Sequence, residues 1–589
     1  MQFDAIIIGS GAGGAPIAHE LVSRGKRVLI LEKGPLFRPQ YQNANGLSDF
    51  KRDELFATGP EKKINLPVAN RGASFYSSHV EPDVNDEPHV YRERDGSDRA
   101  TIEGYTAQVV GGGTQLYGGV SLRFSPTDLR LGSFNDGRND LRNDPGGDVQ
   151  REARDWPIGY SDLEPYYCKT EKLVGINGTS ANQIKPFSAD FYQKPLPTNP
   201  ISGFIETGMS ALNMPRYRTP LAVITEDHAP SGRKVTSDPK TAFVNRYGDP
   251  LGYKSNTWVS LLAPVSTLPN FELRANCVVT HLEASQSRIA RVHYRDGGGV
   301  ARTAEGTIVV VACSAIESVR LLKISGMMNA DFSGRIDPNG MLGKYFLTHS
   351  FGGADARMPG RFDKSMTLDS DWATDFCGTD AFLRANGLWA GATIYNNTSD
   401  RALPISLART HGAQDLDNIW KAFVDDTSIT GERMVQFLDD SFGTHLSVTF
   451  MANQVPLRTN RIELHPTVRD KWGRPVAYII KGWHTHDMWL MDVMAEQCAK
   501  ILRAAGAAEE PSKGGVYHDV SRIANHVLGG ARFGSDPADS VLDPDCRAWQ
   551  FDNLYVTDGS FMPTSGSGNP TLTIQANAFR VADLLAGRL

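Results

Sequence analysis

Cysteines are few in this sequence, and none are arranged as metal ligands. The chain of 589 residues has six, with no CxxC pair among them: Cys168, Cys277, Cys313, Cys377, Cys498 and Cys546. Neither a zinc site nor a cysteine-ligated iron–sulfur cluster is therefore indicated. So few cysteines in so long a chain predict buried thiols rather than a disulfide framework.

Long hydrophobic runs and an excess of positive charge are also absent. No apolar run approaches the roughly 18 residues that a membrane-spanning helix requires, so we predict no membrane span. The 61 Lys and Arg residues against 67 Asp and Glu residues give a net charge of −6, which argues against nucleic acid as a ligand. Length and composition predict a globular protein of two or three domains.

The N-terminus shows no basic region followed by an apolar core and a cleavage site, because a predicted strand begins at once. The expected location is therefore cytoplasmic. A partner subunit that carries an export signal would still allow another location.

The sequence does contain a strand, a glycine turn, a helix and a second strand at its start. Residues 3–8 (FDAIII) are rich in β-branched residues, and the apolar residues of 15–24 recur at helical spacing. Residues 27–31 form the second predicted strand, which ends on Glu32. This order is typical of units that bind the pyrophosphate of a dinucleotide.

Each glycine of this turn has a physical reason. Gly9 permits a tight turn, Gly11 lets backbone approach the phosphates, and Gly14 lets the helix and strand pack closely. The pyrophosphate would lie at the positive end of the helix, and Glu32 would accept hydrogen bonds from a ribose diol. The alternative is an ordinary tight turn with Glu32 on the surface.

The rest of the chain predicts a return to the same domain and a second sheet. Residues 307–312 (TIVVVA) read as a buried strand, and residues 34–99 as irregular structure or an extended arm. Residues from about 345 to 502 show strand-like alternation and also contain an amphipathic helix, roughly 487–504. They indicate a second domain, one sheet with helices behind it. Ser161 is predicted to cap a helix, with Glu164 at capping-box spacing.

Several motifs together resemble the glucose–methanol–choline (GMC) family of FAD-dependent oxidoreductases. They are the Gly9, Gly11, Gly14 and Glu32 fingerprint, VVGGGTQLYGG (109–119), WPIGYSDLEPYY (156–167), CSAIESVRLL (313–322) and the run that begins HVLGGARFG and extends over 526–585. Within the family the chain looks most like pyranose oxidases, glycoside 3-oxidases and bacterial sugar or gluconate dehydrogenase large subunits.

The resemblance implies an α/β fold with a discontinuous, Rossmann-like FAD-binding domain. That domain would comprise residues 1–140, 260–345 and 511–589. An α+β substrate domain, built on an antiparallel sheet with helices, would comprise residues 141–259 and 346–510.

The resemblance also implies which residues hold FAD. Gly9, Gly11, Gly14 and Glu32 would bind its ADP half, and the backbone of Val279 would lie by the adenine. The positions expected near the flavin, the pyrophosphate and the ribityl chain are Gly112, Gly113, Thr114, Asp558, Gly559, Pro570 and Thr571. A helix that begins at Pro570 and Thr571 would direct its positive end at the reduced flavin.

Two departures from the family matter. Some pyranose oxidases have a histidine in the 109–119 loop that bonds FAD covalently, whereas the matching residue here looks like Leu116, so FAD is expected to be non-covalent. Large subunits with an iron–sulfur cluster have cysteines after a Gly-Arg pair, but none follows Gly232-Arg233. Electrons would then pass to oxygen, a quinone or a redox protein, and the chain would form a homo-oligomer or pair with a small partner subunit.

His526 and Asn569 match the family's catalytic pair. Alcohol oxidation needs a base for the hydroxyl proton while hydride goes to flavin N5, and histidine is neutral near pH 7. Local sequence offers Asn569 a second interpretation, as the N-cap of a helix over 571–585 with Pro570 at its first position. His349 is expected to be structural.

The remaining histidine pattern does not predict a metal. His484 and His486 are expected to lie in a solvated loop, since no third ligand is near them in the sequence. Tyr117 is a candidate to cover the flavin, and Asn525 to hydrogen-bond within its loop.

The function implied is FAD-dependent oxidation of a sugar or glycoside hydroxyl to a ketone, with His526 as general base. Three alternatives stay open. The first is oxidation of a non-sugar alcohol by the same chemistry. The second is a non-redox lyase or photoenzyme of the same fold that uses FAD. The third is a nucleotide-binding partner subunit without catalysis.

Overall fold

A computed structural model describes most of the chain. The described residues are 2–49, 66, 86–101, 107–235, 249–362, 370–397, 431–432, 435, 444–515 and 526–589. No helix among them is both long and apolar enough to cross a membrane.

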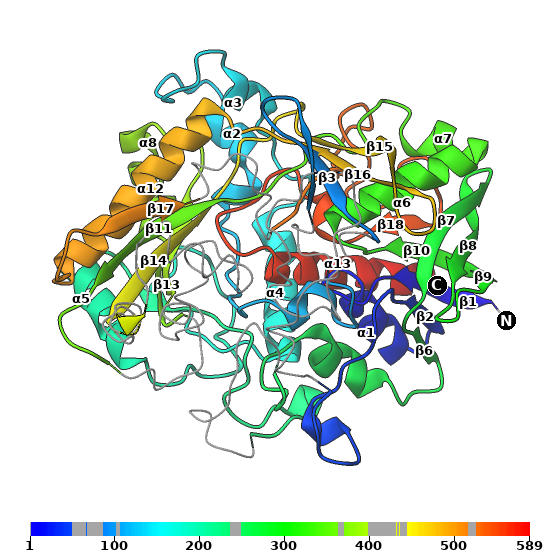
Figure 1. Cartoon of the computed structure of the whole chain (residues 1–589), viewed down its shortest axis with the longest axis horizontal. Helices are drawn as coiled ribbons and strands as arrows, with labels where there is room; N and C mark the ends of the chain where they lie inside the picture. Colours follow the sequence, from blue (N-terminus) through cyan, green and yellow to red (C-terminus); the bar gives the residue numbers. More distant parts are fainter. Residues whose placement is uncertain are drawn as a thin grey trace.

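A five-stranded parallel sheet is built from the start, the middle and the end of the chain (Figure 1). Its order is β18 (Leu554–Val556), β10 (Gly306–Val311), β1 (Phe3–Ile8), β2 (Val28–Leu31) and β6 (Phe271–Arg274). Every neighbouring pair is parallel. The β-branched run of β1 is buried on both sides, as expected for a central strand of a parallel sheet. The predicted α/β fold is confirmed.

Helices from distant parts of the chain pack around this sheet. Helix α13 (Thr571–Arg588) contacts both α1 (Ala15–Ser23) and α4 (Tyr160–Val174). Helix α6 (Ala315–Met328) contacts α7 (Ala330–Ile336) and the antiparallel sheet β7 (Val278–Ser285), β8 (Arg288–Arg295) and β9 (Ala301–Ala304).

The start of α4 differs from the sequence prediction. Ser161 does not cap it, because the helix begins at Tyr160 and Asp162 accepts the hydrogen bond from the Gly159 N–H. Glu164, predicted for the capping box, instead accepts from Ser188.

A second, six-stranded sheet is antiparallel throughout. Its order is β17 (Ser512–Gly515), β11 (Ser350–Arg357), β14 (His445–Ala452), β13 (Ala392–Asn397), β12 (Trp372–Thr374) and β5 (Tyr217–Arg218). Helix α12 (Thr485–Ala504) packs on β11, β14 and β17, and α5 (Gly203–Ala211) packs on α12. This is the predicted sheet with helices behind it, at the left of Figure 1. The shorter helices are α2 (Leu131–Asn135), α3 (Asp148–Glu152) and α8 (Asp380–Asn386).

A four-stranded sheet joins two strands from the first hundred or so residues to two from residues 461–480. Its order is β15 (Arg461–Arg469), β16 (Pro475–Ile480), β3 (His89–Arg92) and β4 (Asp98–Thr101). The prediction of irregular structure over 34–99 is therefore wrong for β3 and β4; residues 50–65 and 67–85 lie outside the described residues. Because this sheet joins segments assigned to different domains, the domain boundaries remain a prediction.

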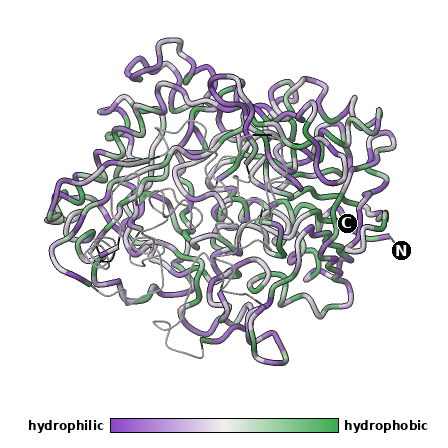
Figure 2. The backbone as a smooth tube through the Cα atoms, in the orientation of Figure 1, coloured by the Kyte–Doolittle hydropathy of each residue, from purple (hydrophilic) through white to green (hydrophobic). Residues whose placement is uncertain are grey.

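The hydrophobic core follows these layers. One buried cluster surrounds the parallel sheet, and a second fills the space between the six-stranded sheet and α12; hydrophobic stretches of the tube in Figure 2 concentrate in the interior. Trp156 is buried in the first cluster, where its Nε1–H donates to Thr564 Oγ1 over 2.8 Å and its ring meets Phe533 and Phe561 edge-on. Burying each such large side chain contributes about 1.5–3 kcal/mol.

Candidate active site

A cavity of about 530 Å³ lies between the parallel sheet and the six-stranded sheet. On one side it is lined by Ile8, Leu31 and Ala312, at the C-terminal ends of β1, β2 and β10. Ligands of open α/β sheets bind at this edge. On the other side it is lined by residues of β11, β13 and β14.

The fold brings almost all of the predicted site residues to this one cavity. Those that line it are Gly9, Gly11, Glu32, Gly112, Gly113, Thr114, Val279, His526, Asp558, Gly559, Asn569, Pro570 and Thr571. Gly14 does not line it. Asn525 lies outside the described residues.

Gly9 and Gly14 are required by the protein itself. Gly9 has a left-handed φ of 101°, and a Cβ there would lie 2.3 Å from the carbonyl oxygen of Ala312. A Cβ on Gly14 would lie 2.1 Å from the carbonyl oxygen of Gly9. These contacts agree with the predicted roles in the turn and in helix packing.

Gly11 and Gly113 are different, because the protein leaves room for a side chain at both. A Cβ on Gly11 would have its nearest neighbour at 3.7 Å, the Cα of Gly112, and a Cβ on Gly113 would have none within 4 Å. Both glycines line the cavity. The space before them therefore remains available to a ligand, as the binding of a dinucleotide pyrophosphate requires.

Glu32 is buried at the end of β2 rather than on the surface. Its Oε2 accepts hydrogen bonds from the Ser10 N–H and hydroxyl, over 3.0 and 2.6 Å, and its Oε1 accepts from the Gly34 N–H over 3.0 Å. Burial raises the pKa of this carboxyl, while the three donors act in the opposite direction. The same hydroxyl accepts from the Gly111 N–H over 2.9 Å, so Ser10 joins the two glycine loops.

Four further charged residues lie in the wall of the cavity that contains Glu32, and they were not predicted from the sequence. Lys33, Glu317, Arg320 and Arg474 all line it. Arg474 Nη1 donates to the carbonyl oxygen of Val279 over 3.2 Å, and Arg320 pairs with Asp470 over 2.6 Å. Glu317 and Arg320 lie within the 313–322 motif, and Lys33 follows Glu32, but Arg474 has no local signal.

Asp558 is buried where β18 leads toward α13. Its Oδ1 accepts from the Ser560 N–H over 2.9 Å, and its Oδ2 accepts from the Ser318 hydroxyl of α6. Burial raises its pKa. The residue thus connects the last strand of the sheet with α6 at the wall of the cavity.

His526 contacts a second histidine, His349. The two Nδ1 atoms are 3.1 Å apart, and the ring planes cross at 82°. Burial lowers the pKa of His526 to about 4, so its imidazole is neutral at pH 7. The expectation of a structural role for His349 included no link to His526, because 177 residues separate the two histidines.

The side chain of Asn569 does not cap α13. The N-cap is Pro570, and it makes no side-chain capping bond, so the N-cap interpretation of Asn569 is wrong. Its Oδ1 is instead buried without a hydrogen-bond partner among the described residues, and the residue lines the cavity. A buried acceptor without a partner is costly unless a ligand satisfies it.

The other wall of the cavity has no charged side chain among the described residues of the six-stranded sheet. It comprises Phe351, Gly352, Tyr395, Thr449 and Met451. Leu116 and Tyr117 also line the cavity. The position of the Tyr117 ring is fixed by its hydroxyl, which donates to the carbonyl oxygen of Ser255 over 2.8 Å.

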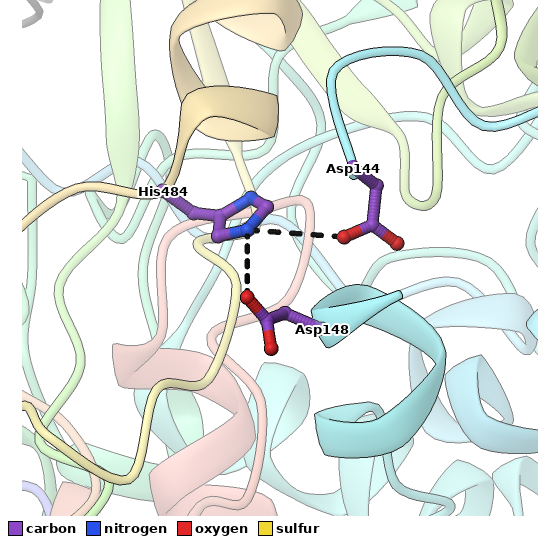
Figure 3. A group of neighbouring side chains, drawn as sticks. All are labelled: Asp144, Asp148 and His484. Atoms are coloured by element: carbon purple, nitrogen blue, oxygen red, sulfur yellow. Dashed lines mark ion pairs between the residues drawn. The ribbon is translucent and has the colours of Figure 1, made fainter. Parts of the chain in front are cut away.

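His484 and His486 lie at the start of α12, not in a solvated loop. His486 is fully buried, and His484 has two carboxylates near it, Asp148 at 3.5 Å and Asp144 at 3.8 Å from its Nε2 (Figure 3). The expectation that no third ligand is near is therefore wrong.

This cluster is nevertheless poorly suited to a metal. The Nδ1 of His484 accepts the His486 N–H over 3.1 Å as a helix cap, so the proton of the neutral ring resides on Nε2 and points at the aspartates. A metal would need the Nε2 lone pair. We assign the cluster to the anchoring of α12.

Comparison with known proteins identifies the family. Two models described as GMC oxidoreductase match residues 228–351 and 456–578, and an FAD binding domain model matches residues 4–64. The chain belongs to the GMC oxidoreductase family. This GMC protein binds FAD and is an oxidoreductase that acts on CH–OH groups.

Relatives span the whole chain. A 2-methyl-1,2-propanediol dehydrogenase of Mycolicibacterium austroafricanum is 25% identical over 100% of this chain and 96% of its own. The paromamine 6'-oxidase of Streptomyces fradiae is 28% identical (100% and 92%), and the gluconate 2-dehydrogenase flavoprotein of Pantoea cypripedii is 24% identical (98% and 92%). Among solved structures, pyridoxine 4-oxidase from Mesorbium loti has the same fold, with a TM-score of 0.58 at 15% identity over 99% of both chains.

Proposed function

We propose that this GMC oxidoreductase oxidises a secondary hydroxyl of a neutral sugar or glycoside to a ketone, with His526 as the general base. The observation that carries the proposal is the pair formed by a neutral His526 and an unsatisfied Asn569 on the wall of one cavity. One offers a proton acceptor, and the other offers an amide that can hydrogen-bond the substrate hydroxyl.

The residues of the chain would share the work of FAD binding. Gly11 and Gly113 would leave space for the pyrophosphate, Glu32 would accept from the ribose, and Asp558 would hold the ribityl chain. The beginning of α13, at Pro570 and Thr571, directs its positive end into the cavity. Leu116 provides no nucleophile for a covalent link, which supports non-covalent binding.

In the proposed mechanism, His526 Nε2 takes the hydroxyl proton while the Asn569 amide N–H donates to the hydroxyl oxygen. The chemistry that FAD supplies when bound is two-electron oxidation at the carbon that carries the hydroxyl. Because His526 carries no charge at pH 7, it is ready to accept the proton. Acceptors expected for the electrons remain oxygen, a quinone or a redox protein.

The substrate class is supported by the uncharged wall of the six-stranded sheet. Phe351 and Tyr395 offer flat apolar surfaces, and Thr449 offers a hydroxyl, whereas no carboxylate among the described residues of that wall would bind an amino sugar. The apolar side chains Phe351 and Met451 also favour a second candidate, oxidation of a small non-sugar alcohol, since a diol dehydrogenase is among the relatives.

An anaerobic substrate panel tests the proposal. The purified holoenzyme would be mixed under nitrogen with neutral glycosides, an aminoglycoside and 1,2-diols, and flavin absorbance at its visible band followed. We expect bleaching by neutral glycosides, with the ketone as product. Bleaching by diols alone would favour the second candidate, and no bleaching by any alcohol would favour non-redox use of FAD. Admitting air afterwards shows whether oxygen is the acceptor.

The variant His526→Gln tests the assigned base. In His526→Gln we expect flavin reduction about 10²-fold slower or more, with FAD still bound. A reduction rate unchanged in that variant would contradict the assignment.

A further inference from the structure

We propose that His349 is a positioning residue: its Nδ1 accepts a hydrogen bond from His526 Nδ1–H and so keeps the lone pair of His526 on Nε2. The inference deepens the proposed function and rests on His526 being the base. A histidine can accept a substrate proton only at a nitrogen that has no proton already.

The hydrogen bond between the two rings requires a single proton, shared by their Nδ1 atoms. The Nδ1–Nδ1 distance of 3.1 Å is a hydrogen-bond distance. Two neutral rings can meet this way only if one Nδ1 is protonated and the other is not. Either His526 donates, which leaves its Nε2 bare, or His349 donates, which places a proton on His526 Nε2 and prevents it from acting as a base there.

The surroundings of His349 favour the first arrangement. His349 is fully buried just before β11, and its Nε2 makes no hydrogen bond of good geometry among the described residues. The backbone at Ser565, Gly566 and Gly568 lies beside this ring and favours its protonated form. Because Nδ1 is engaged with His526, we infer that these backbone groups act on Nε2, where they favour a proton and oppose a bare lone pair. With that proton on Nε2, Nδ1 is free to accept from His526.

His349 is also well suited to remain an acceptor. Burial and the neighbouring His526 hold the pKa of His349 well below its usual range, so it stays neutral when His526 takes a proton. Its Nδ1 lone pair then still accepts from the charged His526 ring. The arrangement resembles the orientation of a catalytic histidine by a carboxylate, but with a neutral partner.

The same neighbourhood is held rigid. The Thr348 N–H donates to Gln454 Oε1 over 2.8 Å, and the Gln454 N–H donates to Ser565 Oγ over 2.9 Å. The start of β11 is thus tied to the segment that leads to Asn569. Leu347 and Leu528 also exchange backbone hydrogen bonds of 2.8 and 2.9 Å, so the segments that contain His349, His526 and Asn569 are held together.

Two substitutions separate the acceptor from the packing. His349→Asn keeps an oxygen close to the place of Nδ1, whereas His349→Leu has a similar volume but no acceptor. For the holoenzyme we expect His349→Leu to slow anaerobic flavin reduction about 10- to 100-fold. We expect His349→Asn to stay within about fivefold of wild type. FAD affinity, melting temperature and substrate Kd should stay close to wild type in both, because His349 does not line the cavity.

The proton itself can be observed without a substrate. In the ¹⁵N-histidine-labelled holoenzyme, we expect His526 as the Nδ1–H tautomer in wild type and as the Nε2–H tautomer in His349→Leu, with His526→Gln used to assign its signals. A wild-type His526 protonated on Nε2 would overturn the inference whatever the substrate proves to be. Equal slowing in both His349 variants with a raised substrate Kd would indicate packing alone and overturn it too. Wild-type reduction rates in His526→Gln would instead reject the proposed base.

Discussion

Replacing Gly11 by alanine should separate cofactor binding from folding. The protein leaves ordinary van der Waals space for a Cβ there, with the nearest atom at 3.7 Å, and Gly11 does not have a left-handed φ. A compatible Gly-to-Ala change stabilises a fold by about 0.4–1 kcal/mol, because the unfolded chain has fewer conformations to lose. We therefore expect Gly11→Ala apoprotein to melt at or slightly above the wild-type temperature.

The same methyl group would occupy the space left for the pyrophosphate. Losing one hydrogen bond between a backbone N–H and a charged phosphate costs about 1.5–3 kcal/mol, which is about tenfold to about 150-fold in affinity. We expect the FAD Kd of Gly11→Ala to rise by that factor, measured by titrating apoprotein and following flavin fluorescence.

Gly9→Ala is the matched control. Its Cβ would meet a backbone oxygen at 2.3 Å from a left-handed φ, so this variant should lose at least about 2 kcal/mol of apoprotein stability. Gly11→Ala that binds FAD with wild-type affinity would refute the assignment of that space to the pyrophosphate. Equal destabilisation of both apoproteins would refute the distinction between the two glycines.

Three further predictions follow from the site. Asn569→Ala should slow flavin reduction by about tenfold or more yet cost no capping energy, since no capping bond exists; a loss of about 1 kcal/mol in urea unfolding would restore the N-cap interpretation. Glu32→Gln should weaken FAD binding, because the amide accepts fewer hydrogen bonds from Ser10, Gly34 and a ribose; titration of apoprotein with an unchanged Kd would argue against that role. The folded-state pKa of His526 lies near 4, below its unfolded value of about 6.5, so protonation favours unfolding: its contribution to stability is present above pH 6.5 and is lost as the pH falls toward 4. Melting temperatures across that range should fall more steeply in wild type than in His526→Gln, and parallel curves would contradict the buried, neutral state.

The parts of the fold that could be predicted are those encoded by contiguous residues. The β-branched run, the three glycines and Glu32 specify β1, the turn, α1 and β2, because each depends on neighbours in sequence. The buried strand near 307–312 and the helix near 487–504 could be predicted in the same way. In contrast, β3 and β4 lie in a polar segment whose pairing with β16 depends on a partner almost 400 residues away.

The site likewise has a part that local motifs predict and a part that depends on residues distant in the sequence. Its nucleotide half follows from motifs, and all but one of the predicted residues reach the cavity. Asn569 was ambiguous because Asn-Pro before a helix is an ordinary cap, and only the tertiary structure turns its side chain away. His349, Arg474 and the wall formed by Phe351 and Tyr395 could not be predicted, since nothing near them in sequence records what faces them.

The parallel sheet is completed by β18, an edge strand that is made after every other strand of that sheet. Until β18 is made, β10 presents an unpaired edge, and Asp558 and Asn569, which follow β18, are missing from the cavity. A nascent chain can therefore complete its α12-backed sheet before β18 is made, but it cannot enclose a cofactor until β18 and the segment after it have been added. Chains terminated before residue 554 should be left as aggregation-prone fragments that no supply of FAD rescues.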